Sequence, residues 1–141
     1  MDKKQKYYDF IKNKVGWCPN KYLPGVNSKS KGHYVYIRDI NKDGTCNVNV
    51  ITSLEEMKFD EIEHKNKFVY NLKKLRQVKM GNTYPIPIKD SNFGKWAGVN
   101  ADVIQNVESN KITKIGVLKF DDKHKPYINK YMGRIKKDKP Q

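Results

Sequence analysis

Lys29–Ser53 reads KSKGHYVYIRDINKDGTCNVNVITS and holds two short apolar runs, His33–Ile40 and Thr45–Ser53. The residues Asn-Lys-Asp-Gly at 41–44 separate the two runs. An Asp-Gly pair between two alternating runs is the strongest short-range signal of a β-hairpin. We therefore predict that these runs pair as antiparallel strands and that the rest of the chain is organised around them.

Alternation gives the second strand of this hairpin two faces, because successive side chains of a strand point to opposite sides. We expect one face in the core and a second, polar face. Thr52 and Ser53 come at the end away from the turn, level with His33. Two hydroxyls, an imidazole and the lysines at 29 and 31 are therefore expected to gather there. The first face holds Cys46, Val48, Val50 and Thr52, and the second holds Thr45, Asn47, Asn49, Ile51 and Ser53.

The charge balance makes a polyanion the leading class of partner. The 141 residues include 29 Lys and Arg against 15 Asp and Glu, a net charge of +14, and such an excess favours nucleic acid. A lysine-rich genome is the alternative reason, but that bias should enrich Glu as well, which is not seen here. A membrane surface fits less well, because no basic helix with a continuous apolar face is found. The length suits one domain.

Motifs for metal, cofactor or export are missing from the sequence. Cys18 and Cys46 are too few for a disulfide scaffold, and they match no zinc spacing. No glycine-rich phosphate loop or nucleophile elbow is present. The N-terminus lacks an apolar signal segment, and no run approaches membrane-spanning length. We therefore expect a cytoplasmic protein that needs no metal or cofactor.

Shorter elements flank the hairpin. An amphipathic helix is predicted within residues 1–15 and a loop over 17–30. Ser53-Leu54-Glu55-Glu56 has the form of a helix capping box, and apolar residues at helical spacing predict a helix over 65–77. Prolines at alternate positions make 83–88 an edge or irregular strand. After it we predict a loop over 90–98, strands over 99–107 and 112–118, a final helix around Pro126 and a mobile basic tail at 133–141.

The order of these elements resembles that of PemK/MazF-type toxins. The segment GVNADVIQNVESNKITKIGVLKFDDKHKPYINKYM at 98–132 is similar to the end of that family, where a strand, a turn, a strand and a final helix follow one another. Val50-Ile51-Thr52-Ser53 looks like the family strand that closes on a Thr-Ser pair. Ser28–Gly32 resembles the loop before the family's second strand. The resemblance extends from residue 22 to residue 132.

The short strands, the loop-rich first half and the closing helix predict a small, strongly curved β-barrel or a half-open sheet with peripheral helices. The resemblance implies a mainly β (α+β) fold, namely a small curved SH3-like β-barrel of PemK/MazF type over 16–132 with peripheral helices. It implies a metal-independent endoribonuclease toxin of a toxin-antitoxin system that cleaves single-stranded RNA. An acidic antitoxin and a homodimer are the implied partners. In the family an arginine and a proline follow the loop glycine, and the arginine is thought to serve the phosphate. Here that place reads Gly32-His33-Tyr34-Val35, without arginine.

Candidate site residues follow from the chemistry of metal-free RNA cleavage. The reaction needs a base for the 2′-hydroxyl, an acid for the departing 5′-oxygen, and positive or hydrogen-bonding groups at the phosphorane. The resemblance implies that Thr52, beside Ser53, is the hydroxyl group at the phosphate. His33 is our candidate to replace the arginine, because a histidine titrates near neutrality. The candidate catalytic residues are thus His33, Thr52 and Ser53, and the candidate RNA-binding residues are Lys29, Lys31, Arg38, Lys95 and Trp96.

Two other functions stay open. The first is a non-catalytic nucleic-acid-binding module with the same barrel and lost cleavage residues, which the missing arginine favours. The second is a protein inhibitor that uses its charge on an acidic partner. Trp96 lies in a predicted loop and is a candidate for stacking on unpaired bases. His64 and His124 are expected to be structural.

Overall fold

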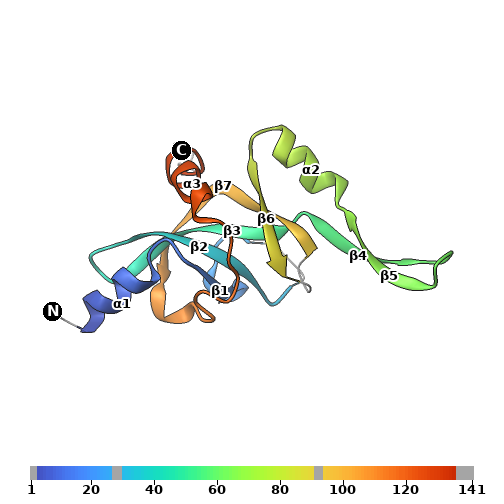
Figure 1. The fold of residues 1–141 in the computed structure, drawn as a ribbon. Coiled ribbons are helices and arrows are strands. Elements are labelled where there is room, and N and C mark those ends of the chain that lie inside the picture. The colour runs from blue at the N-terminus through green and yellow to red at the C-terminus, as the bar shows by residue number, and fades with distance from the viewer. Residues whose placement is uncertain (1–2, 27–29, 91–93, 136–141) are drawn as a thin grey trace.

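An antiparallel sheet of five strands forms the body of the computed structural model, which describes residues 3–26, 30–90 and 94–135 (Figure 1). The strand order is β1-β2-β3-β7-β6. The predicted mainly β class is confirmed. Within the described residues β1 and β6 do not pair with each other, so the sheet is open: no closed barrel is formed, and of the two predicted forms the structure has the half-open sheet. The strands are β1 (Val15–Pro19), β2 (Gly32–Ile40), β3 (Thr45–Ser53), β6 (Thr83–Asp90) and β7 (Gly94–Glu108).

The predicted hairpin lies within this sheet as β2 and β3. Its turn is closed by Asp43, whose carboxylate accepts hydrogen bonds from the amide (3.0 Å) and the hydroxyl (2.6 Å) of Thr45. Gly44 adopts a φ of 86°, a left-handed conformation that glycine reaches without steric cost. β3 then pairs with β2 on one side and β7 on the other, which makes it a central strand.

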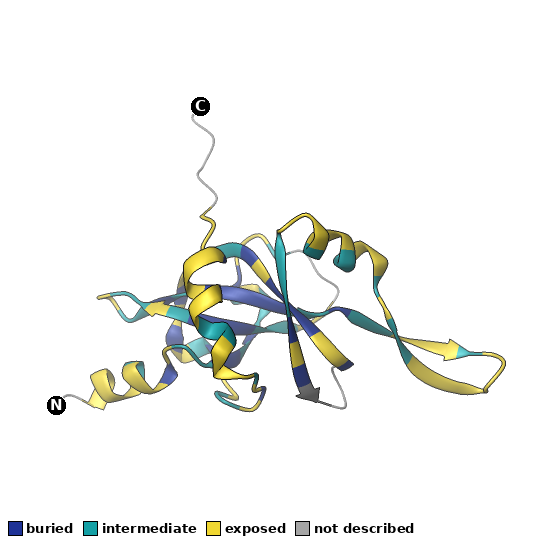
Figure 2. Ribbon diagram, turned by 45° about the horizontal axis from the view of Figure 1, so that its top comes forward, coloured by how far each residue is buried: buried dark blue, intermediate teal, exposed yellow. Residues whose placement is uncertain are grey.

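Apolar side chains are buried on both faces of the sheet (Figure 2). One cluster includes Tyr36, Ile51 and Ile128, and the other includes Ile11, Val35 and Val48. The predicted polar face of β3 is therefore wrong at two positions, since Asn49 and Ile51 are 0% and 1% exposed. Asn49 is tolerated there because its amide donates to the carbonyls of Asn100 (2.8 Å) and Met132 (2.7 Å).

Three flanking segments differ from prediction because long-range pairing decides their structure. Val15–Pro19, within and next to the predicted loop, is strand β1, paired in register with β2. β7 starts at Gly94 rather than at 99, since its first residues pair with β6. The predicted strand at 112–118 is wrong, because it makes only an isolated bridge between Thr113 and Trp17.

A second, two-stranded sheet projects from the body as an arm (Figure 1). It consists of β4 (Glu55–Asp60) and β5 (Lys65–Tyr70), and α2 (Leu72–Lys79) follows it. The predicted helix over 65–77 is therefore wrong in its first half. α2 begins at Leu72 because the Asn71 side chain caps it, accepting from the Lys74 amide at 3.2 Å. The predicted capping box starts no helix, and the Ser53 hydroxyl accepts from the Glu55 amide at 3.1 Å where β3 meets β4.

Helices α1 (Lys3–Ile11) and α3 (Lys125–Tyr131) pack at the two ends of the chain, as predicted. Ile11 anchors α1, and Ile128 and Met132 anchor α3. The predicted mobile tail is wrong at its start, because Arg134 is bound to β7. Its side chain pairs with Asp102 at 2.5 Å, and its backbone exchanges hydrogen bonds with Ala101 and Val103. Residues 136–141 lie outside the described residues. Of the described helices, none is long and apolar enough to cross a membrane.

Candidate nucleic-acid site

His33 lies near the start of β2, and Asn20 of the neighbouring 3₁₀ turn (Asn20–Tyr22) holds its imidazole. The His33 Nδ1 atom lies 2.6 Å from Asn20 Oδ1, while Asn20 Nδ2 donates to the carbonyl of Ser30 at 2.7 Å. Because a carbonyl only accepts, the Asn20 oxygen must face the ring, and the neutral ring must carry its proton on Nδ1. Nε2 then presents a lone pair. No partner for Nε2 is found among residues 3–26, 30–90 and 94–135.

The register of the sheet places Thr52 beside His33. Tyr34 pairs with Ile51, so His33 and Thr52 are the next residues along the two strands and point to one face. On its other side Thr52 pairs with Gly98 of β7. Trp96, two residues from Gly98, points to this same face by alternation. Three of the predicted site residues, His33, Thr52 and Trp96, thus come from three adjacent strands and share one side of the sheet.

Lys74 of α2 brings a positive charge to this face, and the sequence analysis missed it. Its ammonium donates to the Ser53 carbonyl at 2.8 Å, and burial lowers its pKa below the ordinary value for lysine. Among the described residues no carboxylate lies within ion-pairing distance (4.0 Å) of this ammonium. The nearby carboxylate of Glu56 opposes this pKa shift but does not outweigh the burial. A half-buried ammonium is stabilised further when an anion binds next to it. Lys74 is therefore suited to hold a phosphate.

The electrostatics of the cluster keep His33 neutral. Burial lowers the pKa of His33 below 6.5, and the positive charge of Lys74 lowers it further. At pH 7 the ring therefore carries no charge and its Nε2 lone pair is available. A neutral imidazole and a nearby ammonium are the two groups that base-assisted attack on a phosphate requires.

Arg38, a predicted RNA-binding residue, is placed elsewhere and is committed to α3. Its guanidinium donates to the carbonyls of Ile128 (2.8 Å), Asn129 (2.8 Å) and Met132 (3.0 Å). These carbonyls lie at the C-terminal end of α3, where carbonyls run short of backbone donors, although Ile128 also accepts from the Met132 amide and Met132 also accepts from Asn49. Arg38 is thus not brought to the His33 cluster, and it stabilises the end of α3.

Of the three predicted lysines, two are exposed and lie close in sequence to residues of the cluster. Lys31 is exposed two residues before His33, and its carbonyl accepts from the Asn20 amide at 2.9 Å. Lys95 is exposed next to Trp96, and its backbone amide donates to Glu55 at 2.9 Å. Lys29 lies outside the described residues.

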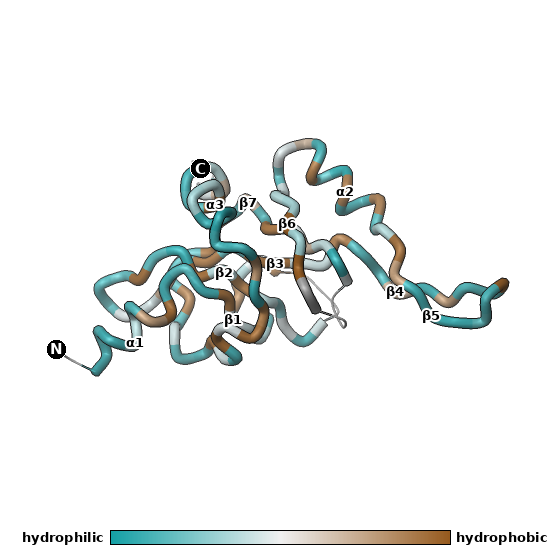
Figure 3. Tube along the Cα trace, viewed as in Figure 1, coloured by the Kyte–Doolittle hydropathy of each residue, from teal (hydrophilic) through white to brown (hydrophobic). Residues whose placement is uncertain are grey.

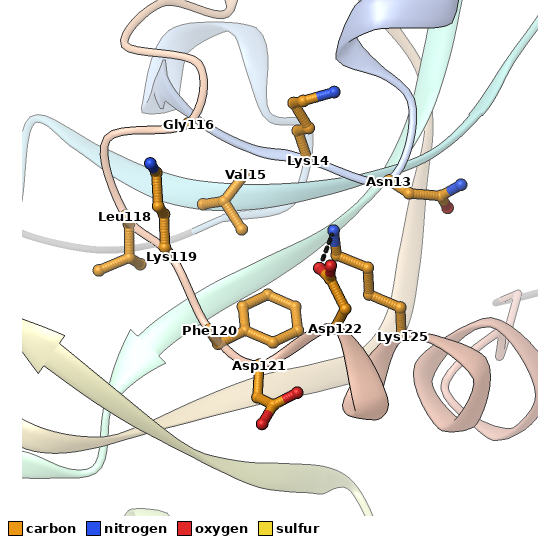
Figure 4. A pocket seen from close by; sticks show the side chains of 10 residues that line it. All are labelled: Asn13, Lys14, Val15, Gly116, Leu118, Lys119, Phe120, Asp121, Asp122 and Lys125. Atoms are coloured by element: carbon orange, nitrogen blue, oxygen red, sulfur yellow. Dashed lines mark ion pairs between the residues drawn. The ribbon is translucent and has the colours of Figure 1, made fainter.

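Two adjoining hollows extend the surface near Trp96. The larger, of about 810 Å³, is lined by Lys95 and Trp96 on one side and by residues 117–121 on the other. The smaller, of about 560 Å³, shares residues 118–121 with it and is drawn in Figure 4. In the smaller hollow Asp122 pairs with Lys125 at 2.7 Å, beside the ring of Phe120 (Figure 4). Basic and aromatic side chains therefore line both hollows.

The two cysteines and His124 contribute to the packing of the fold and lie outside the His33 cluster. Cys18 and Cys46 are fully buried, and burial raises their thiol pKa values to about 11 and about 12. The Nδ1 atom of His124 and the Tyr84 hydroxyl form a hydrogen bond of 2.7 Å, and the two rings pack edge to face. In the described part of the chain, no three His, Cys, Asp or Glu side chains are placed to hold a metal ion.

Comparisons with protein-family models, with curated proteins and with solved structures give no match for this chain. The function has to be argued from the residues of the site itself.

Proposed function

We propose that the chain is a metal-independent endoribonuclease of the PemK/MazF type that cleaves single-stranded RNA. One observation carries this proposal. The Nε2 lone pair of a neutral, Asn20-oriented His33 lies on the same face as Thr52, with the half-buried ammonium of Lys74 close enough to lower the pKa of the ring. We interpret the open five-stranded sheet as a variant of the SH3-like barrel of that family.

In this reaction each residue has a separate role. His33 Nε2 takes the proton of the 2′-hydroxyl, and the freed oxygen attacks the adjacent phosphorus. The bond from phosphorus to the 5′-oxygen breaks, which leaves a 2′,3′-cyclic phosphate and a 5′-hydroxyl. Lys74 stabilises the charge on the phosphorane and gives its proton to the departing oxygen, and its lowered pKa makes it a better acid than an ordinary lysine. The Thr52 hydroxyl donates to a non-bridging oxygen.

The missing family arginine is replaced in this proposal by a residue from another part of the chain. Position 33 carries histidine, so the strand itself supplies no guanidinium. Lys74 brings a cation to the same end of the hairpin from α2, through its bond to Ser53. Nucleotides that flank the cleaved bond would lie along Trp96 and Lys95, because an exposed aromatic ring beside a cation suits unpaired bases.

A cleavage assay on a single-stranded RNA oligonucleotide in EDTA tests the proposal. We expect wild-type protein to cleave, the double variant His33→Ala/Thr52→Ala to lose cleavage, and the control His64→Ala to cleave normally, because His64 is exposed at the arm tip. RNA that is bound in a salt-sensitive way but left intact by wild-type protein would support the non-catalytic module instead. A neighbouring reading frame for a small acidic protein would support the antitoxin partner.

A further inference from the structure

The β4–β5 arm has one apolar face and one charged face. Pairing of Met57 with Phe68 and of Glu55 with Tyr70 sets these side chains, and Phe59, on one face. The other face is charged and carries ion pairs from Lys58 to Glu56 (3.3 Å) and from Lys67 to Asp60 (2.5 Å). The charged side chains therefore have partners or water around them, whereas the apolar side chains of the other face are exposed to water. The exposed apolar residues are Met57 (53%), Phe59 (58%), Ile62 (91%) and Tyr70 (53%).

This apolar face is large for a projecting element. Each exposed aromatic side chain presents roughly 100 Å² of surface, about half of its full area. In Figure 3 hydrophobic residues alternate with hydrophilic ones along the arm, and a short hydrophobic stretch lies at its tip. Leu72 and Met80, next to the arm on α2 and just after it, are also exposed, at 79% and 63%. Contiguous apolar patches of several hundred Å² mark interaction sites. A free two-stranded hairpin is also only marginally stable in water, so a cover on this face would stabilise the arm.

Charge on the arm runs opposite to charge on the body. Residues 55–70 contain five acidic and three basic side chains, a net charge of −2 in a chain of net charge +14. The tip holds Asp60, Glu61 and Glu63. Asp60 pairs with Lys67 and Glu63 pairs with Lys65 at 3.4 Å, so the tip keeps a small net negative charge. The basic end is α2 at the base, with the exposed side chains of Lys73, Arg76 and Lys79. The arm with its helix is therefore polarised along its length.

We propose that the apolar face of the arm is covered by the same face of a second copy of this chain, with the two arms antiparallel. A two-fold axis makes such a contact self-complementary. Met57, Phe59, Phe68 and Tyr70 of the two copies pack together, and each acidic tip lies against the basic α2 of the other copy. RNA is a poor occupant of this face, because the face carries no cation. The inference does not rest on the nuclease proposal, since it uses no residue of the His33 cluster.

Sedimentation or light scattering of the full chain measures this association without RNA. We expect a species of twice 16.5 kDa at micromolar concentration. Phe59→Lys should raise the dissociation constant at least tenfold, whereas Lys58→Gln, on the opposite face of the same strand, should leave it unchanged. Circular dichroism shows whether each variant keeps the body folded. A wild-type monomer at 100 μM or more, on the order of the weakest specific contacts, would overturn the proposal, as would an equal effect of the two variants.

Charge reversal and cross-linking test the antiparallel arrangement. Glu61→Lys/Glu63→Lys should weaken the dimer, and adding Arg76→Glu/Lys79→Glu to the same chain should restore it. Ile62→Cys/Met80→Cys should form an intermolecular disulfide between positions 62 and 80 on mild oxidation, found by peptide mapping. The native Cys18 and Cys46 do not interfere, because both are fully buried. Links joining only 62 to 62, or failure of the charge swap to restore the dimer, would exclude this arrangement.

Discussion

Replacing Lys74 with methionine removes the cation that α2 brings to His33, and we expect a large loss of RNA cleavage. Methionine keeps the length and apolar stem of the side chain but not the charge. Loss of one group that stabilises a developing oxyanion costs about 10²–10³-fold in rate, or about 2.7–4 kcal/mol. The free energy of unfolding should change little, by about 1 kcal/mol. The variant loses the hydrogen bond to the Ser53 carbonyl, but it also removes the cost of burying the ammonium.

The pH dependence makes this prediction sharper. The charge of Lys74 lowers the pKa of His33, so its removal raises that pKa toward the ordinary value. The base works only when neutral, and the acidic limb of the pH–rate profile should therefore move to higher pH in Lys74→Met. A residue that served only the fold would change stability without moving this limb.

Single-turnover cleavage of an RNA oligonucleotide in EDTA, from pH 5 to 9, is the assay. Lys73→Met is the matched control, because Lys73 is the exposed neighbour on the same helix. Lys74→Arg should retain part of the activity, since it keeps the charge. The reasoning is refuted if Lys74→Met cleaves like wild type, if Lys73→Met loses as much activity, or if the acidic limb stays in place while the thermal midpoint is unchanged.

Three further predictions concern other contacts. Asn20→Asp places a carboxylate at the Nδ1–H of His33 and should raise the pKa of that histidine, which ring NMR titration measures directly; an unchanged titration would contradict the tautomer deduced from Asn20. Arg38→Met removes the guanidinium bonds to the carbonyls of Ile128, Asn129 and Met132, and should lower the free energy of unfolding by about 1.5–3 kcal/mol in urea titrations, while RNA affinity of the folded protein stays the same. Cys18 and Cys46, with pKa values raised to about 11 and about 12, should react with a thiol reagent at pH 8 only as the protein unfolds, and a fast reaction of native protein would show that the core opens locally.

Short-range patterns were sufficient for the parts of this protein that local chemistry controls. Asp43-Gly44 closes the β2–β3 turn, the prolines at 85 and 87 keep β6 at an edge, and Pro126 lies in the first turn of α3. Each of these depends on residues within a few positions of one another. The basic charge and the two free cysteines are likewise properties of the sequence alone.

The elements that sequence patterns assigned wrongly are those decided by partners far along the chain. Phe68 and Val69 fit a helical stripe, but pairing with β4 makes them a strand, and only the Asn71 cap lets the helix begin. The sheet does not close into a barrel because, in the described residues, β1 and β6 do not pair with each other. Whether two strands so far apart in the sequence pair is decided by tertiary contacts.

The candidate site divides in the same way. The hairpin signal by itself brought His33 level with the Thr52-Ser53 end of β3. The register next to the turn would pair His33 with Ser53, and only the shift between Ile37 and Asp39 places it opposite Thr52, on the same face. Only the tertiary structure added Asn20, which fixes the tautomer of the ring, and Lys74, which supplies the charge. Both reach His33 across sequence separations that no local pattern encodes. Folding of α2 and of the 3₁₀ turn against the sheet therefore decides what the hairpin can do chemically.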